Sequence, residues 1–300
     1  MAGSVFVFEY LSAGDADADA AGLLAQGRSM RDAVAADLRD AGLRVSVAGV
    51  DCRPRPGEDR IDFVRRQCAH HDASWIVAPE SDGLLQRLHA AVTEAAGAAR
   101  WVGCAASAIA IASSKRATLE RLAAHGVATP LDAPAAAGWV VKPDDGAGCL
   151  ATRRHASEAA ALGDLAARHA AGEAATLEPW VDGEPLSLAL LCHAGTAELL
   201  AVNRQRIVAD ADGSVRFAGV DVAALAPDDA RTPALRALAA TLARALPGLA
   251  GYVGVDLVWH AERGPVAIEV NPRVTCAYVG LSRRLGRNLG REIVAPHLDG

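Results

Sequence analysis

The segment from Tyr252 to Arg273, YVGVDLVWHAERGPVAIEVNPR, constrains the fold of this chain more than any other stretch. Two runs of alternating apolar residues, 255–259 and 266–270, flank a turn that contains the dipeptide Gly-Pro. This pattern is typical of a β-hairpin. Successive side chains of a strand point to opposite faces, so one face of the hairpin should lie on the core. We expect that face to carry Val255, Leu257, Trp259, Val266, Ile268 and Val270.

The opposite face of the hairpin carries acidic residues. A turn centred between residues 262 and 263 places Asp256 directly across from Glu269, with Cβ atoms about 5 Å apart. Two carboxylates at that distance repel each other, and a divalent cation between them makes the electrostatic interaction favourable. With Asn271 as a third oxygen ligand, the set suits Mg²⁺, which takes one or two carboxylates and completes its shell with water and phosphate. The alternative is an ordinary amphipathic hairpin with its polar face in water.

The first 105 residues or so alternate between short apolar runs and helical periodicities. We expect a first helix to begin at Ser29 and a third to be capped by Ser81, and we expect the run of Asp and Ala at 15–21 to be a loop. The strands of this unit are expected over 5–8, 43–47 and 75–77. The βαβαβ order predicts an α/β fold with a parallel sheet covered on both faces.

Ligands of such parallel sheets bind beyond the carboxyl ends of the strands. That rule makes Glu9 and Tyr10, after the first strand, and Glu80, after the third, candidates for substrate contact. Loop solvation or helix capping is the alternative for each of them. No Gly-x-Gly-x-x-Gly follows the first strand, which argues against a dinucleotide site.

Only two of the 30 Lys and Arg residues are lysines, Lys115 and Lys142. Lys115 follows the expected cap Ser114 and lies in the first turn of a helix, where a cation opposes the helix dipole unless an anion such as phosphate binds there. Lys142 ends an expected strand and precedes a loop with Gly146 and Gly148, whose amides are suited to cradling phosphate oxygens. The loop is not a Walker A motif, because the lysine precedes the glycines. Chance placement and a simple turn are the alternatives.

The segment EPWVDGE, from Glu178 to Glu184, interrupts a strand at Pro179. A flat heterocycle can lie against Trp180 and Val181 while backbone groups contact its edge, and Glu184 is then placed to hold a ribose. The alternative is a hinge between domains.

Arginines dominate the last third of the chain. Strands expected over 187–192 and 199–202 lead into Arg204 and Arg206, and Arg204 is a further candidate for substrate contact. Arg273 follows Asn271 by two residues, and its planar fork suits a phosphate or a carboxylate.

Composition excludes several classes of function. The net charge of −6 argues against general nucleic-acid binding. No apolar run approaches the roughly 20 residues of a membrane helix, and no basic region precedes the first apolar run, so we expect neither a membrane span nor a signal peptide. Six scattered cysteines indicate reduced thiols in a cytoplasm better than disulfides or zinc ligands.

Taken together, these motifs resemble the ATP-grasp superfamily, and the resemblance covers nearly the whole chain. The order is a lysine before a short helix, a lysine with a glycine loop, EPWV with a later Glu, and an Asp followed by Glu-x-Asn. The 13-residue gap from Asp256 to Glu269 agrees with the pattern of D-alanine–D-alanine ligases. The resemblance implies a pre-ATP-grasp domain over 1–105, a lid subdomain over 106–180, and a C-terminal subdomain over 181–300 that clasps ATP with the lid.

The resemblance also implies a role for each matching residue. Phosphates of ATP would be contacted by Lys115 and Lys142 and by the loop at Gly146 and Gly148, and Lys142 also meets the adenine. The adenine edge would be held by Glu178 and Val181, beside Trp180, and the ribose by Glu184. Two Mg²⁺ ions, with Mn²⁺ as an alternative, would be held by Asp256, Glu269 and Asn271.

The implied activity is that of a ligase that joins a carboxylate to an amine through an acyl phosphate. Arg273 and Arg206 are then the candidates for holding that acyl phosphate, with Lys142 as the third catalytic residue. Cys149 departs from the glycine or serine common in family loops, so lid closure is expected to differ. The rival interpretations are an ATP-grasp enzyme that carboxylates or phosphorylates, a non-catalytic ATP-binding regulator, and an α/β protein whose hairpin binds Ca²⁺ or nothing.

Within the superfamily, VFEYLSAG, APESDG, NRQRI and EVNPRVTCAYVGL look most similar to tyramine–glutamate ligase-like proteins of methanofuran-type cofactor synthesis. This similarity implies a small-molecule acid and amine as partners, and the superfamily's dimers make a homodimer the expected assembly.

Overall fold

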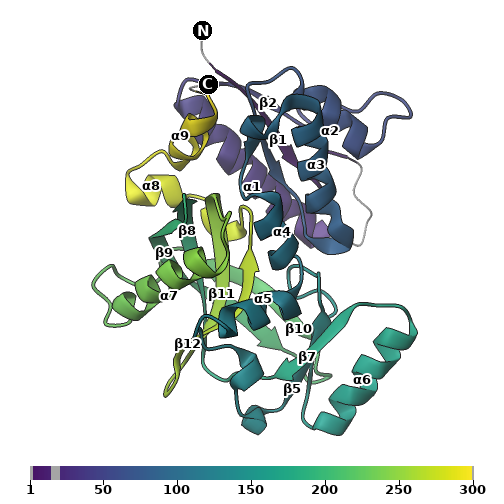
Figure 1. The fold of residues 1–300 in the computed structure, drawn as a ribbon, viewed down its shortest axis with the longest axis vertical. Helices are drawn as coiled ribbons and strands as arrows, with labels where there is room; N and C mark the ends of the chain where they lie inside the picture. The colour runs from purple at the N-terminus through teal and green to yellow at the C-terminus, as the bar shows by residue number, and fades with distance from the viewer. Residues whose placement is uncertain (1–2, 15–20, 299–300) are drawn as a thin grey trace.

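The computed structural model describes residues 3–14 and 21–298, which contain three sheets (Figure 1). The first is a parallel sheet in the order β2-β1-β3-β4. Its strands are β1 (Ser4–Glu9), β2 (Arg44–Val47), β3 (Ala73–Val77) and β4 (Trp101–Val102). Its helices are α1 (Ala21–Asp40), α2 (Arg60–Cys68) and α3 (Leu84–Ala96). The α/β class with a parallel sheet at the N-terminal end is therefore confirmed.

Strand β1 shows why this sheet is buried on both faces. Phe6 and Phe8 pack into the core cluster that contains Phe63 of α2. Val5 and Val7 alternate with them and pack into the cluster on the α1 side. A parallel sheet needs apolar side chains on both faces, because its crossover helices cover both.

The second sheet is antiparallel, in the order β10-β9-β8-β11-β12, and it forms the middle of the molecule. Its elements are β8 (Glu184–His193), β9 (Thr196–Ala209), β10 (Val215–Asp221), α7 (Thr232–Ala245), β11 (Gly251–His260) and β12 (Gly264–Asn271). Helices α4 (Ala106–Ala112) and α5 (Lys115–Ala123) precede the third sheet in the chain, but α5 packs on β12 of the second.

The third sheet is small and forms the far end of the molecule in Figure 1. Its antiparallel order is β6-β5-β7. It comprises β5 (Trp139–Pro143), β6 (Arg153–His155), α6 (Glu158–Ala170) and β7 (Ala175–Pro179). The strand β7 includes Pro179, where we expected it to have ended.

The pairing expected for the β11–β12 hairpin is confirmed, but the geometry that produces it differs. The turn is centred on Glu262, half a residue earlier than expected. A bulge then inserts Ile268 into β12, and this shift brings Asp256 opposite Glu269. The bulge also removes Ile268 from the core face, and Ala267 is fully buried instead.

Two expected helix starts are wrong and one is confirmed. Helix α1 begins at Ala21, and Ser29 lies inside it, where its hydroxyl donates to the backbone of the preceding turn. Ser81 opens a 3-10 turn ahead of α3 and does not cap that helix. Ser114 caps α5 as expected, accepting a hydrogen bond from the amide of Ala117. The run expected as a loop at 15–21 lies outside the described residues except for Ala21.

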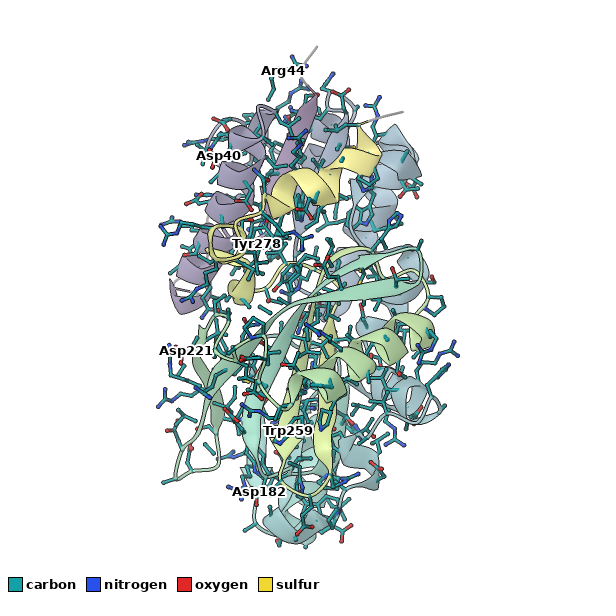
Figure 2. The ribbon with its side chains drawn as sticks, turned by 90° about the vertical axis from the view of Figure 1, so that its left-hand side faces the viewer. Asp40, Arg44, Asp182, Asp221, Trp259 and Tyr278 are labelled. Atoms are coloured by element: carbon teal, nitrogen blue, oxygen red, sulfur yellow. The ribbon has the colours of Figure 1, made fainter. Side chains whose placement is uncertain are left out.

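The end of the chain returns to the first sheet. Helices α8 (Leu281–Leu285) and α9 (Leu289–Val294) pack into the core cluster that contains α1 and the Val5 side of β1. Tyr278 anchors this return, because its hydroxyl donates to Asp37 of α1 at 2.6 Å. Figure 2 shows Tyr278 in the half of the molecule that holds Asp40, far from Trp259. The expected domain limits remain predictions.

None of the described helices has the length and apolarity to cross a bilayer.

Candidate active site

A cavity of about 690 Å³ is lined by residues of all three sheets. Most of the residues singled out in the sequence line it, namely Glu9, Lys115, Lys142, Gly146, Gly148, Glu178, Trp180, Val181, Asp256, Glu269, Asn271 and Arg273. Five others do not line it, namely Tyr10, Glu80, Glu184, Arg204 and Arg206. The cavity therefore joins the predicted phosphate, heterocycle and metal residues into one site.

The acidic face of the hairpin forms one wall of the cavity. Asp256 accepts hydrogen bonds from Gln205 Nε2 (2.9 Å) and from Asn271 Nδ2 (3.5 Å). Burial raises the pKa of Asp256, and the facing carboxylate of Glu269 raises it further. Two facing carboxylates with a carboxamide beside them are an oxygen donor set that fits Mg²⁺. Among the described residues, no group of three or more His, Cys, Asp and Glu is placed to hold a metal ion, so the remaining ligands would come from water and phosphate.

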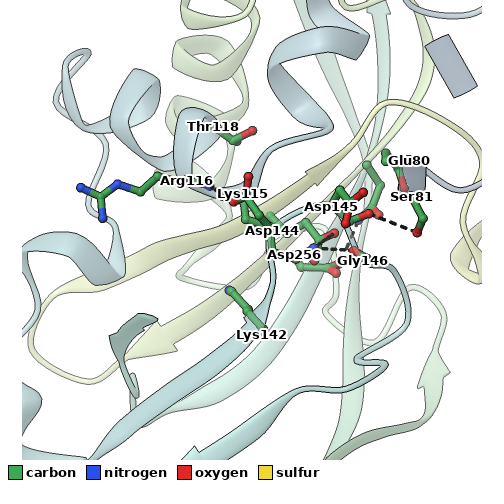
Figure 3. Close-up of polar contacts among 12 residues, drawn as sticks. Glu80, Ser81, Lys115, Arg116, Thr118, Lys142, Asp144, Asp145, Gly146 and Asp256 are labelled. Atoms are coloured by element: carbon green, nitrogen blue, oxygen red, sulfur yellow. Dashed lines mark hydrogen bonds and ion pairs between the residues drawn. The ribbon is translucent and has the colours of Figure 1, made fainter. Parts of the chain in front are cut away.

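Both lysines line the cavity and are buried. Figure 3 shows how they lie relative to Asp256. The ammonium of Lys115 donates to the carbonyl of Gly146 and lies 3.4 Å from Oε1 of Glu269. Lys142 forms an ion pair with Glu178. Burial would lower the pKa of Lys142, but the charge of Glu178 raises it. Both lysine side chains therefore lie in the cavity, Lys115 against Glu269 of the candidate metal site and Lys142 against Glu178.

The glycine loop is attached at its N-terminal end to two other parts of the molecule. The side chain and carbonyl of Asp144 accept hydrogen bonds from the first two backbone amides of α5, at 2.8 and 2.9 Å. Asp145 bonds to the N-terminal unit: its carboxylate accepts from the amide of Asp82 (2.8 Å) and its carbonyl from the hydroxyl of Ser81 (3.2 Å) (Figure 3). These contacts hold Gly146 against the lysine side of the cavity, and they explain Ser81, which sequence reasoning assigned to a helix cap.

The arm of the cavity between the third sheet and β8 is a slot with one wide aromatic wall. Trp180 carries the guanidinium of Arg154 over its ring at 4.8 Å, and its indole N–H donates to Asp182 (3.1 Å). Glu178 is 1 % exposed, and no described group other than Lys142 contacts its carboxylate as a donor. Sequence reasoning missed Arg154, because β6 is short and carries no apolar alternation that would mark it as a strand.

The contacts of Glu184 differ from the expected contact with a ribose. Its carboxylate accepts from Arg204 at 2.6 Å and from Arg231 at 2.5 Å, and these two contacts lower its pKa against the opposing effect of burial. Arg204 is therefore a partner of Glu184 and does not line the cavity. A ribose at Glu184 would have to compete with both guanidinium groups.

The two arginines expected to hold an acyl phosphate differ in position, because one lines the cavity and the other does not. Arg273 lines the cavity, has a side chain that is 11 % exposed, and donates to Glu80 through two nitrogens at 2.9 and 3.0 Å. Arg206 is half-exposed and pairs with Asp221, on the opposite face of β9 from the cavity-lining Gln205. Because side chains alternate along a strand, the catalytic role expected for Arg206 is not supported by its position.

The two candidates at the end of β1 also differ in whether they line the cavity. Glu9 is 3 % exposed and lines the cavity. Tyr10 points away, and its ring lies under the guanidinium of Arg60 at 4.4 Å. Glu80, at the end of β3, contacts the site only through Arg273.

Comparisons with known proteins agree with this geometry. A family model described as the ATP-grasp domain matches residues 112–277, and a model of the pre ATP-grasp 3 domain matches residues 30–109. No curated protein matches the chain in sequence.

Three solved structures show the same fold at low identity. A protein from Archaeoglobus fulgidus assigned to the ATP-grasp superfamily is 22 % identical, with a TM-score of 0.74, over 97 % of this chain and 88 % of its own. D-alanine–D-alanine ligase from Bacillus anthracis is 15 % identical, with a TM-score of 0.71, over 99 % and 98 %. The L-amino acid ligase of Bacillus licheniformis is 16 % identical, with a TM-score of 0.69, over 99 % and 74 %. At these identities the likeness establishes the fold.

Proposed function

The chain belongs to the ATP-grasp family, and on that basis we propose that it is an ATP- and Mg²⁺-dependent ligase that joins a carboxylate to an amine, with release of ADP and phosphate. The observation that carries the proposal is the convergence of both lysines, both hairpin carboxylates and Arg273 on one cavity. An α/β protein with a merely solvated hairpin would not gather every lysine it has around two facing acids. Two of the solved structures with this fold are named as amino-acid ligases, which supports the same reaction class.

Different residues would contribute to different parts of the first half-reaction. A carboxylate is a poor electrophile, and transfer of the γ-phosphoryl group to it gives an acyl phosphate with a good leaving group. Lys115 and Lys142 would neutralise charge on the phosphoryl group in transit, and positioning with electrostatics supplies most of the catalysis in such transfers. Bound Mg²⁺, held by Asp256, Glu269 and Asn271, would supply further charge neutralisation.

The second half-reaction needs a dry site and no protein nucleophile. The amine attacks the acyl carbon, the C–N bond forms, the C–O bond to phosphate breaks, and the amine loses a proton. Arg273 is the group placed to hold the leaving phosphate. Water competes with the amine, so the loop fastened by Asp144 and Asp145 serves as the lid that excludes it.

The finer assignment rests on the sequence resemblance alone. We propose L-glutamate as the acid and tyramine or a related amine as the nucleophile, in synthesis of a methanofuran-type cofactor in the cytoplasm. We also propose two metal ions, Mg²⁺ or Mn²⁺, and a homodimer.

Phosphate release from Mg-ATP tests the proposal, measured with L-glutamate and a panel of amines that includes tyramine, each omitted in turn. Release that requires an acid and one amine, with ADP and an amide as products, is the expected result. Release that requires bicarbonate, or a stable phosphorylated product, would replace the ligase with a carboxylating or phosphorylating enzyme. ATP binding without release under any condition would indicate a regulator.

Exchanging arginine for lysine distinguishes the two arginine candidates. Arg273→Lys keeps the charge but loses the two-nitrogen contact, so we expect phosphate release to fall about 10–100-fold. Arg206→Lys should stay within about twofold, because an exposed ion pair contributes little. Equal losses in both variants, at unchanged thermal stability, would contradict the placement of Arg206 outside the site.

A further inference from the structure

One face of α1 closes the end of the cavity nearest the parallel sheet. Leu23, Gln26, Gly27 and Met30 all line the cavity, and their spacing of three, one and three places them on one side of a helix. The glycine loop reaches the same end, since a Cβ at Gly148 would lie 3.5 Å from Leu23. We call this end the α1 arm. It lies between α1 and the ends of β1 and β3, apart from the slot at Trp180.

Glu9 is the buried charge of the α1 arm. Its carboxylate accepts hydrogen bonds from the backbone amides of Leu11 (3.2 Å) and Ser12 (2.8 Å). No Lys, Arg or His pairs with it among the described residues, and the remaining residues of the sequence contain none of these side chains. Glu80, at the end of the neighbouring strand, has its charge cancelled by Arg273. Of the two carboxyl groups that follow these strands, Glu80 has a cationic partner, whereas Glu9 has backbone amides and no described cation.

Helix α1 is shaped around this carboxylate. A Cβ at Gly27 would lie 2.5 Å from Oε2 of Glu9 and 2.6 Å from Oε1, so no larger residue fits without displacing the acid. Glycine destabilises a helix interior relative to alanine. The fold thus accepts a weaker helix and a buried carboxyl group with no described cationic partner at the same point.

A buried carboxylate without a cation is unfavourable until a cation arrives. The surfaces beside Glu9 are largely apolar, with Leu11, Leu23, Met30 and Ala78 among them. An ammonium ion with an apolar body is the ligand that satisfies both features. Metal ions fit poorly here, because a single carboxylate that already accepts two backbone amides offers few free oxygen sites.

We propose that the α1 arm binds the ammonium group of a substrate with an apolar body, and that Glu9 is its ionic partner. The proposal rests on the proposed function, since it assigns this arm to one of the two co-substrates of a ligase. It names a subsite and a substrate class, and it separates that subsite from the lysines that contact phosphate.

A purely structural role for Glu9, in holding the turn at Leu11 and Ser12, makes a different prediction. Glu9→Gln keeps an oxygen that accepts from the turn but removes the charge. A structural role therefore predicts little change in ligand affinity. An ionic role predicts a selective loss for cationic ligands.

Binding is to be measured by titration calorimetry on the full chain with Mg²⁺ and a non-hydrolysable ATP analogue present. The probes are paired: L-leucine with N-acetyl-L-leucine, L-phenylalanine with N-acetyl-L-phenylalanine, and tyramine with N-acetyltyramine. The first probe of each pair carries an ammonium group and is called the cationic probe, although the two amino acids are zwitterions. At least one cationic probe should bind, and its acetylated partner should bind at least about 10-fold more weakly, as the loss of a charge-assisted hydrogen bond requires. Glu9→Gln should weaken the cationic probe by about 10–100-fold and leave the ATP analogue within about twofold.

Two further variants complete the design. Gly27→Ala, which displaces the carboxylate, should act in the same direction as Glu9→Gln. Glu58→Gln, in the same unit but paired with Arg66 outside the cavity, should change no probe affinity. Equal binding of a cationic probe and its acetylated partner, unchanged affinity in Glu9→Gln, or no binding by any cationic probe would each overturn the proposal. Loss of ATP-analogue binding by the unaltered chain would instead overturn the proposed function.

Discussion

Replacing Asp256 with Asn or Glu269 with Gln is expected to reduce Mg-ATP-dependent phosphate release by about a thousandfold or more. Either change removes a charged ligand from a site where a metal ion contributes several kcal/mol of transition-state stabilisation. The two residues face each other across the β11–β12 hairpin, so each change affects the same ion. Steady-state phosphate release at saturating ATP and millimolar Mg²⁺ measures the loss.

Asp256→Asn should also stabilise the metal-free protein. Burial and Glu269 raise the pKa of Asp256, so its ionised form destabilises the fold when no cation is bound. Since the folded pKa lies above the unfolded value of about 3.9, stability should fall as pH rises from there through the folded pKa. Asp256→Asn removes this dependence. Thermal melts without Mg²⁺ at several pH values should therefore show a higher Tm for the variant at neutral pH than for the parent.

Glu262→Gln is the matched control, because Glu262 lies exposed at the turn of the same hairpin. It should change neither the activity nor the pH dependence of the melt. Survival of Mg-ATP turnover in both Asp256→Asn and Glu269→Gln would show that the metal site lies elsewhere.

Lys142→Met is expected to produce the largest loss of stability of any single change in the site. Its partner Glu178 is 1 % exposed and has no other donor among the described residues, so the variant leaves a buried charge unpaired. Breaking a buried pair in this way typically costs about 3–5 kcal/mol. ATP affinity should also fall, because the lysine faces the cavity where phosphate is proposed to bind.

The double variant Lys142→Met with Glu178→Gln separates the two effects. Removing both charges should restore most of the thermal stability, because replacing both members of a buried pair is often nearly neutral. It should not restore turnover, because neither change returns the positive charge. Arg216→Met provides the exposed comparison: its ion pair with Asp210 is on the surface and should be worth about 0–1 kcal/mol. If the single variant Lys142→Met were as stable as the parent, the Lys142–Glu178 pair would not be part of the folded structure in solution.

Local rules decided the parts of the site that lie on one element. Strand alternation placed Asp256, Glu269 and Asn271 on the polar side of the hairpin, and the cap at Ser114 placed Lys115 at the start of α5. The scarcity of lysine marked Lys115 and Lys142 before any contact was known. These features depend on the period of a strand or a helix, which the backbone fixes regardless of what lies nearby.

Register and partners were not decided locally. The turn lies half a residue earlier than expected, and the bulge at Ile268 restores the pairing of Asp256 with Glu269. The apolar alternation of the sequence does not predict this bulge. The pairs Arg273–Glu80 and Glu184–Arg231 join residues 193 and 47 positions apart. Arg206 was a reasonable candidate by sequence position, but strand alternation pointed it out of the cavity. Which face of β9 meets that cavity depends on how the sheets pack.

The amino-acid sequence by itself determined that this chain is an α/β protein with an ATP-grasp order of motifs, and it marked two lysines and one acidic hairpin as candidates for phosphate and metal binding. Only the tertiary structure decided which acidic side chains have an oppositely charged partner and which do not. It pairs Glu80 with Arg273 and Glu184 with two arginines, and it packs Glu9 against Gly27 with no cationic partner in the described part of the chain. The reason is physical: alternation along one strand is a property of a few consecutive residues, whereas the compensation of a buried charge depends on side chains brought together from the whole chain.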